Sequence, residues 1–134
     1  MDQSNIGVSA ALAGHAARAR YDTLPSTVLP AFKRALLDFL TCAVSGSTMP
    51  VSQAMLAYFE ENDATRDATV LGSGRKTSVP NAAFVNGANV HGLDFDDGYL
   101  QAAAHPGGAV FPAVLALAER NGASAHEVIT AVTI

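Results

Sequence analysis

The chain has 134 residues, of which 49% are hydrophobic and 15% are charged, and its formal net charge is −4. This apolar content is typical of a folded globular protein, and the length is that of one domain of ~100–150 residues. The acidic balance provides no basic surface, so nucleic acid and anionic lipid are excluded as expected partners. We therefore expect one globular core.

The cysteine content and the lack of long apolar runs indicate in which cellular compartment the protein is expected. Cys42 is the single cysteine, so packing rather than a disulfide must hold the fold, which fits a reducing environment. The first residues lack a positively charged stretch before an apolar run, and no signal peptide is expected. The apolar-rich segment 28–44 contains three charged residues, too many for a transmembrane helix. We predict a cytoplasmic protein without a membrane partner.

Hydrophobic residues recur at helical spacing through the N-terminal half of the chain. A first helix is predicted over residues 5–20. A second helix, over residues 28–44, carries the broadest apolar stripe, with Ser26 as a possible N-cap and Gly46 near its end. A third helix is predicted over residues 51–61.

A short β-like segment follows the third helix. Residues 68–71 are suited to an extended conformation, and Gly72-Ser73-Gly74 suits a tight turn because glycine tolerates positive φ. We expect at most one pair of strands near residues 68–76.

Three more helices are predicted in the C-terminal half. Pro80 fits the first turn of one of them, and Ser124 and Glu127 have the spacing of a capping box at the start of the last. A loop is expected at residues 95–107. The predicted fold class is all-α, with about six helices and one short β-like segment near residues 68–76. The predicted helices cover residues 78–91, 110–119 and 124–134.

Acidic residues and two histidines gather after the helix predicted over residues 78–91. The segment His91-Gly92-Leu93-Asp94-Phe95-Asp96-Asp97 has three carboxylates within four positions, and His105 follows fourteen positions after His91. Like charges this close raise one another's pKa unless a cation, a metal or hydrogen-bond donors compensate them. No Lys or Arg occurs from Thr77 to Glu119. Since His105 precedes Pro106-Gly107-Gly108, the loop could aim its imidazole into a cleft.

Other interpretations of these residues are open. In one, Asp96 and Asp97 cap or solvate a helix end and His105 is an ordinary loop histidine. The three aspartates and two histidines also carry metal-ligating atoms, but their spacing matches neither an EF-hand nor a zinc motif, so no metal is expected. The run Asp94-Phe95-Asp96-Asp97 resembles the D-x-D-D pattern of class II terpene cyclases, in which the central aspartate acts as an acid.

Five motifs follow one another along the second half of the chain: Ala82-Ala83-Phe84-Val85-Asn86-Gly87, His91-Gly92-Leu93-Asp94-Phe95-Asp96-Asp97, His105-Pro106, Pro112-Ala113 and Ala116-Leu117-Ala118-Glu119. In this order and spacing they resemble the MmgE/PrpD family, and the resemblance covers nearly the whole chain. Members of this family include 2-methylcitrate dehydratase, cis-aconitate decarboxylase and iminodisuccinate epimerase, which are several times longer.

The resemblance implies a large all-α domain and a smaller α+β domain, with an active site between them and no metal or organic cofactor. Residues 1–134 are then expected to be the N-terminal part of the helical domain, with the rest of that domain and the α+β lid domain outside the chain. It also implies that Asp94 and His105 are catalytic and face a small polycarboxylate, and we expect Asp97 and His91 to bind substrate.

Gly98 stands where some members of the family have threonine, and the interval to His105 is longer by one residue. These differences leave the identity of the substrate open. Family members are commonly homodimeric, and a partial helical domain is expected to expose apolar faces, so we predict a homo-oligomer. The residues expected on those faces are Phe111, Val114, Val128, Ile129 and Val132.

The expected function is that of the N-terminal portion of a cofactor-independent lyase, a 2-methylcitrate dehydratase-like hydro-lyase that moves a proton next to a carboxylate. Family sites also use lysines, a second histidine and a tyrosine from later positions, so the chain alone is expected to be inactive. One alternative is a cis-aconitate decarboxylase-like or epimerase-like activity of the full-length protein. The other is a stand-alone, degenerate helical domain that serves as an interaction or scaffold module.

Overall fold

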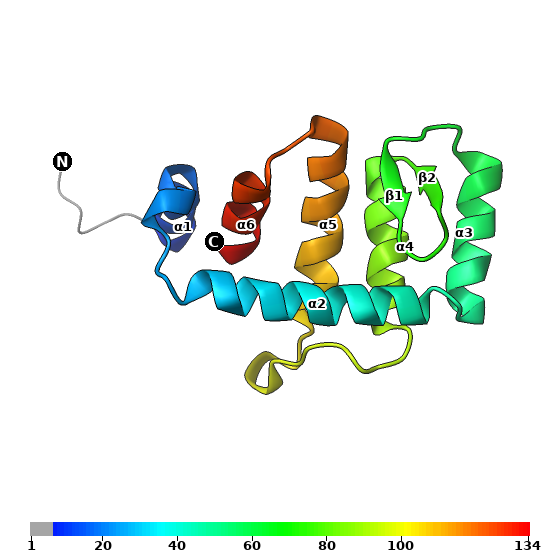
Figure 1. Ribbon diagram of the computed structural model, residues 1–134, viewed down its shortest axis with the longest axis horizontal. Helices are drawn as coiled ribbons and strands as arrows, with labels where there is room; N and C mark the ends of the chain where they lie inside the picture. The colour runs from blue at the N-terminus through cyan, green and yellow to red at the C-terminus, as the bar shows by residue number, and fades with distance from the viewer. Residues whose placement is uncertain (1–6) are drawn as a thin grey trace.

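The computed structural model describes residues 7–134. This part of the chain forms six α-helices and one two-stranded hairpin, with two single-turn 3₁₀ helices between them (Figure 1). The prediction of an all-α fold with a short β segment is therefore confirmed. In chain order the elements are α1 (Val8–Arg18), η2 (Tyr21–Thr23), α2 (Val28–Gly46), α3 (Pro50–Asn62), β1 (Ala68–Val70), β2 (Arg75–Thr77), α4 (Val79–His91), η3 (Leu100–Ala102), α5 (Pro106–Asn121) and α6 (Ala125–Thr133).

The helix predicted over residues 5–20 corresponds to α1. Positions 5 and 6 lie outside the described residues, as do the N-terminal residues on which the expected absence of a signal peptide rests. No helix within residues 7–134 is long and apolar enough to cross a membrane.

The long helix α2 organises the fold. Figure 1 shows α4, α5 and α6 running side by side across the direction of α2, and α2 contacts all three. The β1–β2 hairpin packs against α4 and α5, and α3 contacts α4 near the other end of the molecule. The segment 92–105 joins the C-terminal end of α4 to the N-terminal end of α5, so these two helix ends form one edge of the structure.

The start of α5 corrects the sequence prediction. The helix begins at Pro106 rather than at residue 110, and the loop expected over residues 95–107 ends at His105. Proline is favoured at the first helical position because the missing N–H has no intrahelical partner there. Gly107 and Gly108, predicted to lie in a flexible loop, therefore belong to the first turn of α5.

The two predicted N-caps have different outcomes. The capping box before α6 is confirmed, because the Ser124 hydroxyl accepts from the Glu127 N–H at 3.3 Å and Glu127 accepts from the Ser124 N–H at 2.7 Å. The N-cap of α2 is Thr27 rather than Ser26, and its side chain makes no capping hydrogen bond.

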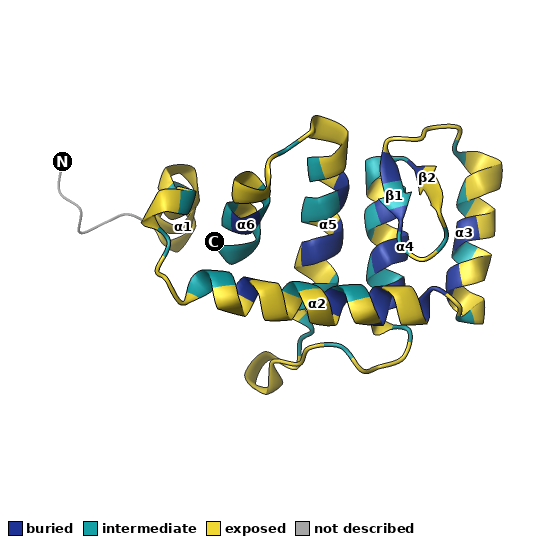
Figure 2. Cartoon of the chain, in the orientation of Figure 1, coloured by how far each residue is buried: buried dark blue, intermediate teal, exposed yellow. Residues whose placement is uncertain are grey.

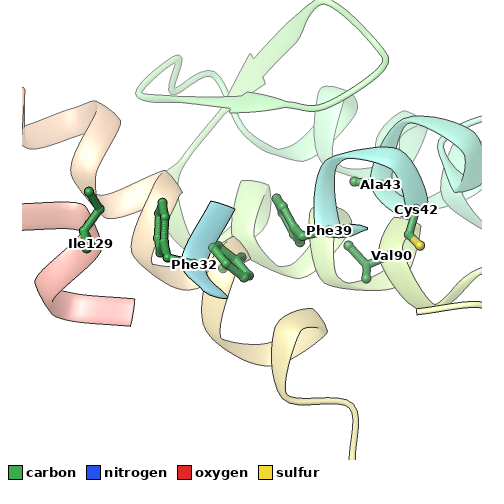
Figure 3. Close-up of a cluster of buried hydrophobic side chains, with 7 residues drawn as sticks. Phe32, Phe39, Cys42, Ala43, Val90 and Ile129 are labelled. Carbon is green, nitrogen blue, oxygen red and sulfur yellow. The ribbon is translucent and has the colours of Figure 1, made fainter. Parts of the chain in front are cut away.

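The apolar core forms where α2 crosses the other helices, and Figure 2 shows buried positions gathered on the sides that face one another. Phe39 is 1% exposed, and its ring lies 5.1 Å from that of Phe111. Phe111 and Ile129, expected to be exposed, are buried in this cluster because α2 covers them. Figure 3 shows part of the cluster, whose buried members are Phe32, Phe39, Cys42, Ala43, Val90, Phe111 and Ile129.

Cys42 is a core residue of α2, as its place in the apolar stripe predicts. Burial raises the pKa of the Cys42 thiol, and Asp38 acts in the same direction. A raised pKa disfavours the thiolate, so Cys42 contributes packing rather than nucleophilic chemistry.

The hairpin is tied to the helices by polar side chains. Ala68 pairs with Thr77 and Val70 with Arg75 in antiparallel register. Glu119 of α5 accepts from the N–H and the hydroxyl of Thr69, both at 2.7 Å, and pairs with Lys76 at 2.6 Å. Burial acts to raise the pKa of Glu119, but the bonds from Lys76 and Thr69 lower it overall. The hairpin is thus fixed against α5.

Candidate functional site

Close packing of α4 against α5 brings two histidines together. A Cβ atom at Gly87 would lie 3.1 Å from the carbonyl oxygen of Gly108, so glycine at position 87 allows the backbones of the two helices to approach. His91 is the last residue of α4, one turn beyond Gly87, and His105 immediately precedes α5. Their ring centroids are 4.7 Å apart.

Asp96 lies between these two imidazoles. Its Oδ1 is 3.1 Å from the Nδ1 of His91, which forms a hydrogen bond, and its Oδ2 is 3.4 Å from the Nδ1 of His105. The Asp96 side chain is 0% exposed, whereas the side chains of His91 and His105 are 55% and 38% exposed. The carboxylate is therefore buried beneath two imidazoles that are open to solvent.

Two atoms of this group have no hydrogen-bond partner among the described residues. They are Asp96 Oδ2 and His105 Nδ1, both buried. Buried polar atoms are paired in most native proteins, and hydrogen bonds at catalytic sites are often long before substrate binds. The 3.4 Å separation means that a small movement of either side chain would pair both atoms.

Asp97 binds the start of α5. Both of its carboxylate oxygens accept from the Gly107 N–H, at 3.0 and 3.1 Å, and a Cβ atom at Gly107 would lie 2.6 Å from Asp97 Oδ1. A carboxylate is stabilised at a helix N-terminus by the unpaired N–H groups and by the helix dipole. The structure supports the capping interpretation for Asp97, although the capped helix is α5 rather than α4. Its expected role in substrate binding stays a prediction.

The Asp94 carboxylate makes no hydrogen bond or ion pair with His91, Asp96 or His105 among the described residues. The Asp94 N–H donates to the carbonyl of His91 at 3.0 Å, and the φ of Asp94, 51°, is in the left-handed region, which aspartate tolerates better than most residues. Asp94 and His105 are both expected to face substrate, and the catalytic role of Asp94 stays a prediction.

Asp96 is the residue that sequence reasoning missed as a site residue. It entered only as a possible metal ligand, a possible cap and a member of the D-x-D-D run. Of the three aspartates, Asp96 alone contacts both histidines, and the sequence signal for this is weak. The contact depends on how the segment between α4 and α5 folds back, which spacing along the chain does not determine.

A small open cavity accompanies the group. Its volume is about 240 Å³, and its lining combines two imidazoles and a carboxylate with the small residues of α4 and α5. The described residues that line the cavity include no lysine or arginine. The lining therefore has groups that can transfer protons but no permanently charged cation. The lining residues are Gly87, His91, Asp96, His105, Gly108 and Ala109.

The same donor set could hold a metal ion. His91, Asp96 and His105 each offer one ligand atom, an imidazole nitrogen or a carboxylate oxygen, and these three atoms lie within 4.8 Å of one another. Two imidazoles and one carboxylate suit zinc or another first-row transition metal, whereas calcium and magnesium require more oxygen ligands. The same geometry is also explained without a metal. Both Nδ1 atoms lie near the Asp96 carboxylate, so each could carry a proton that faces it.

Comparison with known proteins identifies the family. The model of the MmgE/PrpD N-terminal domain matches residues 10–134. The chain belongs to the MmgE/PrpD family. The resemblance found in the sequence motifs is thereby confirmed, and the matched region contains the whole His91–Asp96–His105 group.

Curated relatives are cis-aconitate decarboxylases. The chain is 38% identical over 97 residues to the enzyme from Homo sapiens, a match that covers 72% of this chain and 20% of the relative. It is 31% identical over 113 residues to the enzyme from Aspergillus terreus and 34% identical over 113 residues to that from Mus musculus. Each of these two matches covers 84% of this chain and 23% of the relative. The chain is therefore a domain of a lyase family and spans less than a quarter of these relatives.

Proposed function

We propose that this chain supplies one wall of the active site of a cofactor-independent lyase that acts on a small polycarboxylate. The observation that carries the proposal is the pair of solvent-open imidazoles, His91 and His105, gathered on buried Asp96 at the joined ends of α4 and α5. The cavity beside them gives a reacting carbon access to both rings. The names of the curated relatives support a substrate with several carboxylates.

The chemistry requires a group that gives or takes a proton beside a carboxylate. In a decarboxylation the bond between carbon and the departing carboxylate breaks, carbon dioxide leaves, and the electron pair stays on the remaining carbon skeleton. An acid then protonates that carbon. In a dehydration a base removes a proton next to a carboxylate and an acid protonates the leaving hydroxyl. An imidazole exchanges protons near neutral pH and can serve in either reaction, and we assign this role to His105.

The choice between these reactions follows the relatives. A 2-methylcitrate dehydratase-like hydro-lyase is the expectation from the sequence motifs, and decarboxylation and epimerisation are its alternatives. The relatives from human, mouse and Aspergillus terreus are cis-aconitate decarboxylases, which supports decarboxylation, so cis-aconitate is the first substrate to test. Asp94, Asp97 and His91 complete the proposed set of site residues.

Electrostatics indicates that the chain needs further residues for turnover. The segment that carries the site bears the negative charges of Asp94, Asp96 and Asp97, and the sequence has no Lys or Arg from Thr77 to Glu119. Unpaired like charges at close range oppose binding. We therefore propose that the cations come from outside residues 1–134, and that these residues are the N-terminal part of a helical domain completed by further helices and an α+β lid domain.

A chimeric enzyme tests this proposal. Residues 10–134, the range matched by the family model, replace the corresponding segment of the human cis-aconitate decarboxylase, and release of carbon dioxide from cis-aconitate is measured. We expect turnover by the chimera and none by the isolated chain. A folded chimera without activity on cis-aconitate or 2-methylcitrate would contradict the proposed function, and turnover by the isolated chain would contradict its dependence on further residues. A chimera carrying the corresponding Aspergillus terreus segment serves as the control for the junctions.

One observation favours a second candidate, a stand-alone interaction or scaffold domain. Helix α1 buries no residue, and its apolar side chains Val8 and Leu12 are 77% and 64% exposed. The intact mass of the natural gene product separates the two candidates, because a mass of 13.8 kDa would favour the interaction domain and a mass several times larger would favour the lyase. Within the lyase proposal the protein is a homo-oligomer of the cytoplasm.

A further inference from the structure

The position of Asp96 constrains where the protons of the two histidines lie. An ionised carboxylate only accepts hydrogen bonds, so an imidazole nitrogen that faces it must carry a proton. The two nitrogens that face Asp96 are both Nδ1, at 3.1 Å from Oδ1 for His91 and at 3.4 Å from Oδ2 for His105. Oδ1 is hydrogen-bonded to His91, and Oδ2 lies beside the Nδ1 of His105 without a hydrogen bond.

Burial limits the groups with which Asp96 and His105 Nδ1 can pair. The Asp96 side chain is 0% exposed, and the Nδ1 atom of His105 is buried although 38% of its side chain is exposed. Among the described residues, nothing else pairs with either Oδ2 of Asp96 or Nδ1 of His105. A buried carboxylate oxygen beside a buried nitrogen favours a proton on that nitrogen, since the alternative leaves two acceptors facing each other.

We propose that Asp96 is a positioning residue that holds His91 and His105 in the Nδ1–H tautomer and so leaves Nε2 of each ring as the nitrogen that meets substrate. The inference deepens the proposed function and rests on it for the role of Nε2. It assigns no contact with substrate to Asp96 itself. In this tautomer of the neutral ring, Nε2 carries no proton and is the nitrogen that can accept one.

The backbone around Asp96 fits this role. A Cβ atom at Gly108 would lie 3.3 Å from Asp96 Oδ2 and 3.6 Å from Val90, so glycine at position 108 leaves room for the carboxylate. The neighbouring Asp97 binds the Gly107 N–H and keeps the same segment against α5. Asp96 is thus held between α4 and the first turn of α5, from which its two oxygens reach the two rings.

Nitrogen-15 NMR of the histidine side chains in the 134-residue chain tests the proposal without substrate. Spectra are recorded above the pH at which both imidazoles titrate, with and without a chelator. We expect His91 and His105 to carry the proton on Nδ1, with no change on adding the chelator. A proton on Nε2 of both rings in the unmodified chain would overturn the proposal, and so would a spectrum that changes with the chelator, because Asp96 would then belong to a metal site.

The Asp96→Asn variant sharpens the test. A carboxamide has a single acceptor oxygen, so it can keep at most one ring in the Nδ1–H form, and we expect the other ring to change to Nε2–H. Asp67→Asn is the control and should leave both tautomers unchanged, because Asp67 is exposed and lies outside the segment between α4 and α5. Unchanged tautomers in folded Asp96→Asn would overturn the proposal. If Asp96→Asn does not fold, the spectrum of the unmodified chain still decides.

The outcomes of this experiment and of the chimera assay are distinguishable. The tautomers are read in the isolated chain, whereas the proposed function is read as turnover by the chimera. Nδ1–H tautomers with an inactive chimera would keep the assignment that Asp96 sets the tautomers and would reject the proposed lyase together with the role of Nε2. Nε2–H tautomers with an active chimera would support the proposed lyase and reject the proposed role of Asp96.

Discussion

Two aspartates lie at opposite ends of α4 and have different surroundings. Asp63 lies at the N-terminal end, where its Oδ2 accepts from the Ser78 N–H at 2.9 Å, the Thr77 hydroxyl at 2.8 Å and the Asn81 amide at 2.8 Å. Its Oδ1 accepts from the Thr65 N–H at 2.8 Å. Asp96 lies at the C-terminal end, where one oxygen has a histidine partner and the other has none among residues 7–134.

The difference separates a carboxylate that stabilises the fold from one available for chemistry. Hydrogen bonds from Ser78, then from Thr65 and Thr77, hold the pKa of Asp63 far below its ordinary value. These neighbours are hydroxyl, amide and backbone groups whose charge does not change near neutral pH. The neighbours of Asp96 are two imidazoles, the side-chain type that most often transfers protons in catalysis. The same residue type thus fixes a helix start at one end of α4 and gathers proton carriers at the other.

Removing the carboxylate at the N-terminal end should have the largest effect on stability. Asp63→Ala leaves three donors around the start of α4 without their acceptor, and we expect the melting temperature to fall by several degrees. Thermal unfolding followed by circular dichroism measures this. Asp67→Ala is the matched control, since Asp67 is exposed in the same segment. Equal melting temperatures for the two variants would show that Asp63 does not stabilise the helix start.

Acid should reduce the difference in melting temperature between the unmodified chain and Asp63→Ala. Because the pKa of Asp63 is lower in the folded than in the unfolded state, its contribution is present above its ordinary value of 3.8 and declines as the pH falls below that value. We expect the two melting temperatures to converge with falling pH between about pH 4 and pH 2. A constant difference across that window would contradict the assignment of the hydrogen bonds to Asp63.

A smaller effect on the melting temperature is expected near the C-terminal end of α4, where the candidate site lies. Gly107→Ala places a Cβ 2.6 Å from Asp97 Oδ1, and the exposed carboxylate can shift away at little cost. We expect faster hydrogen exchange at the amide of residue 107 and a fall in melting temperature smaller than for Asp63→Ala. Gly98→Ala is the control, because no atom lies within 4 Å of a Cβ at that position. An unchanged exchange rate at residue 107 would mean that Asp97 does not hold the start of α5.

The helices were predictable from the sequence because their signals are local. The apolar stripe of α2, the capping box of Ser124 and Glu127, and the glycine turn after Val70 each determine structure within a few residues. The early start of α5 was missed since Pro106-Gly107-Gly108 is read locally as a loop. Its glycines are explained only by their neighbours in space, Asp96, Asp97 and α4.

The candidate site was predictable in its residues but not in its contacts. His91, His105 and the acidic run were found from composition and spacing. Which aspartate meets the histidines depends on the path of residues 92–105, where Asp94 has positive φ and Asp97 turns to the Gly107 N–H. Asp96 is left as the carboxylate between the rings. Such choices follow from tertiary packing, which one sequence does not reveal.

The central claim is that an imidazole on this chain carries the proton of a lyase reaction, and the turnover number of the chimera with His105→Gln tests it most directly. General acid–base groups contribute about a hundredfold or more, so we predict a loss of at least about a hundredfold in kcat on cis-aconitate. His15→Gln in exposed α1 should leave kcat unchanged. A kcat for the folded His105→Gln chimera equal to that of the parent chimera would contradict the account.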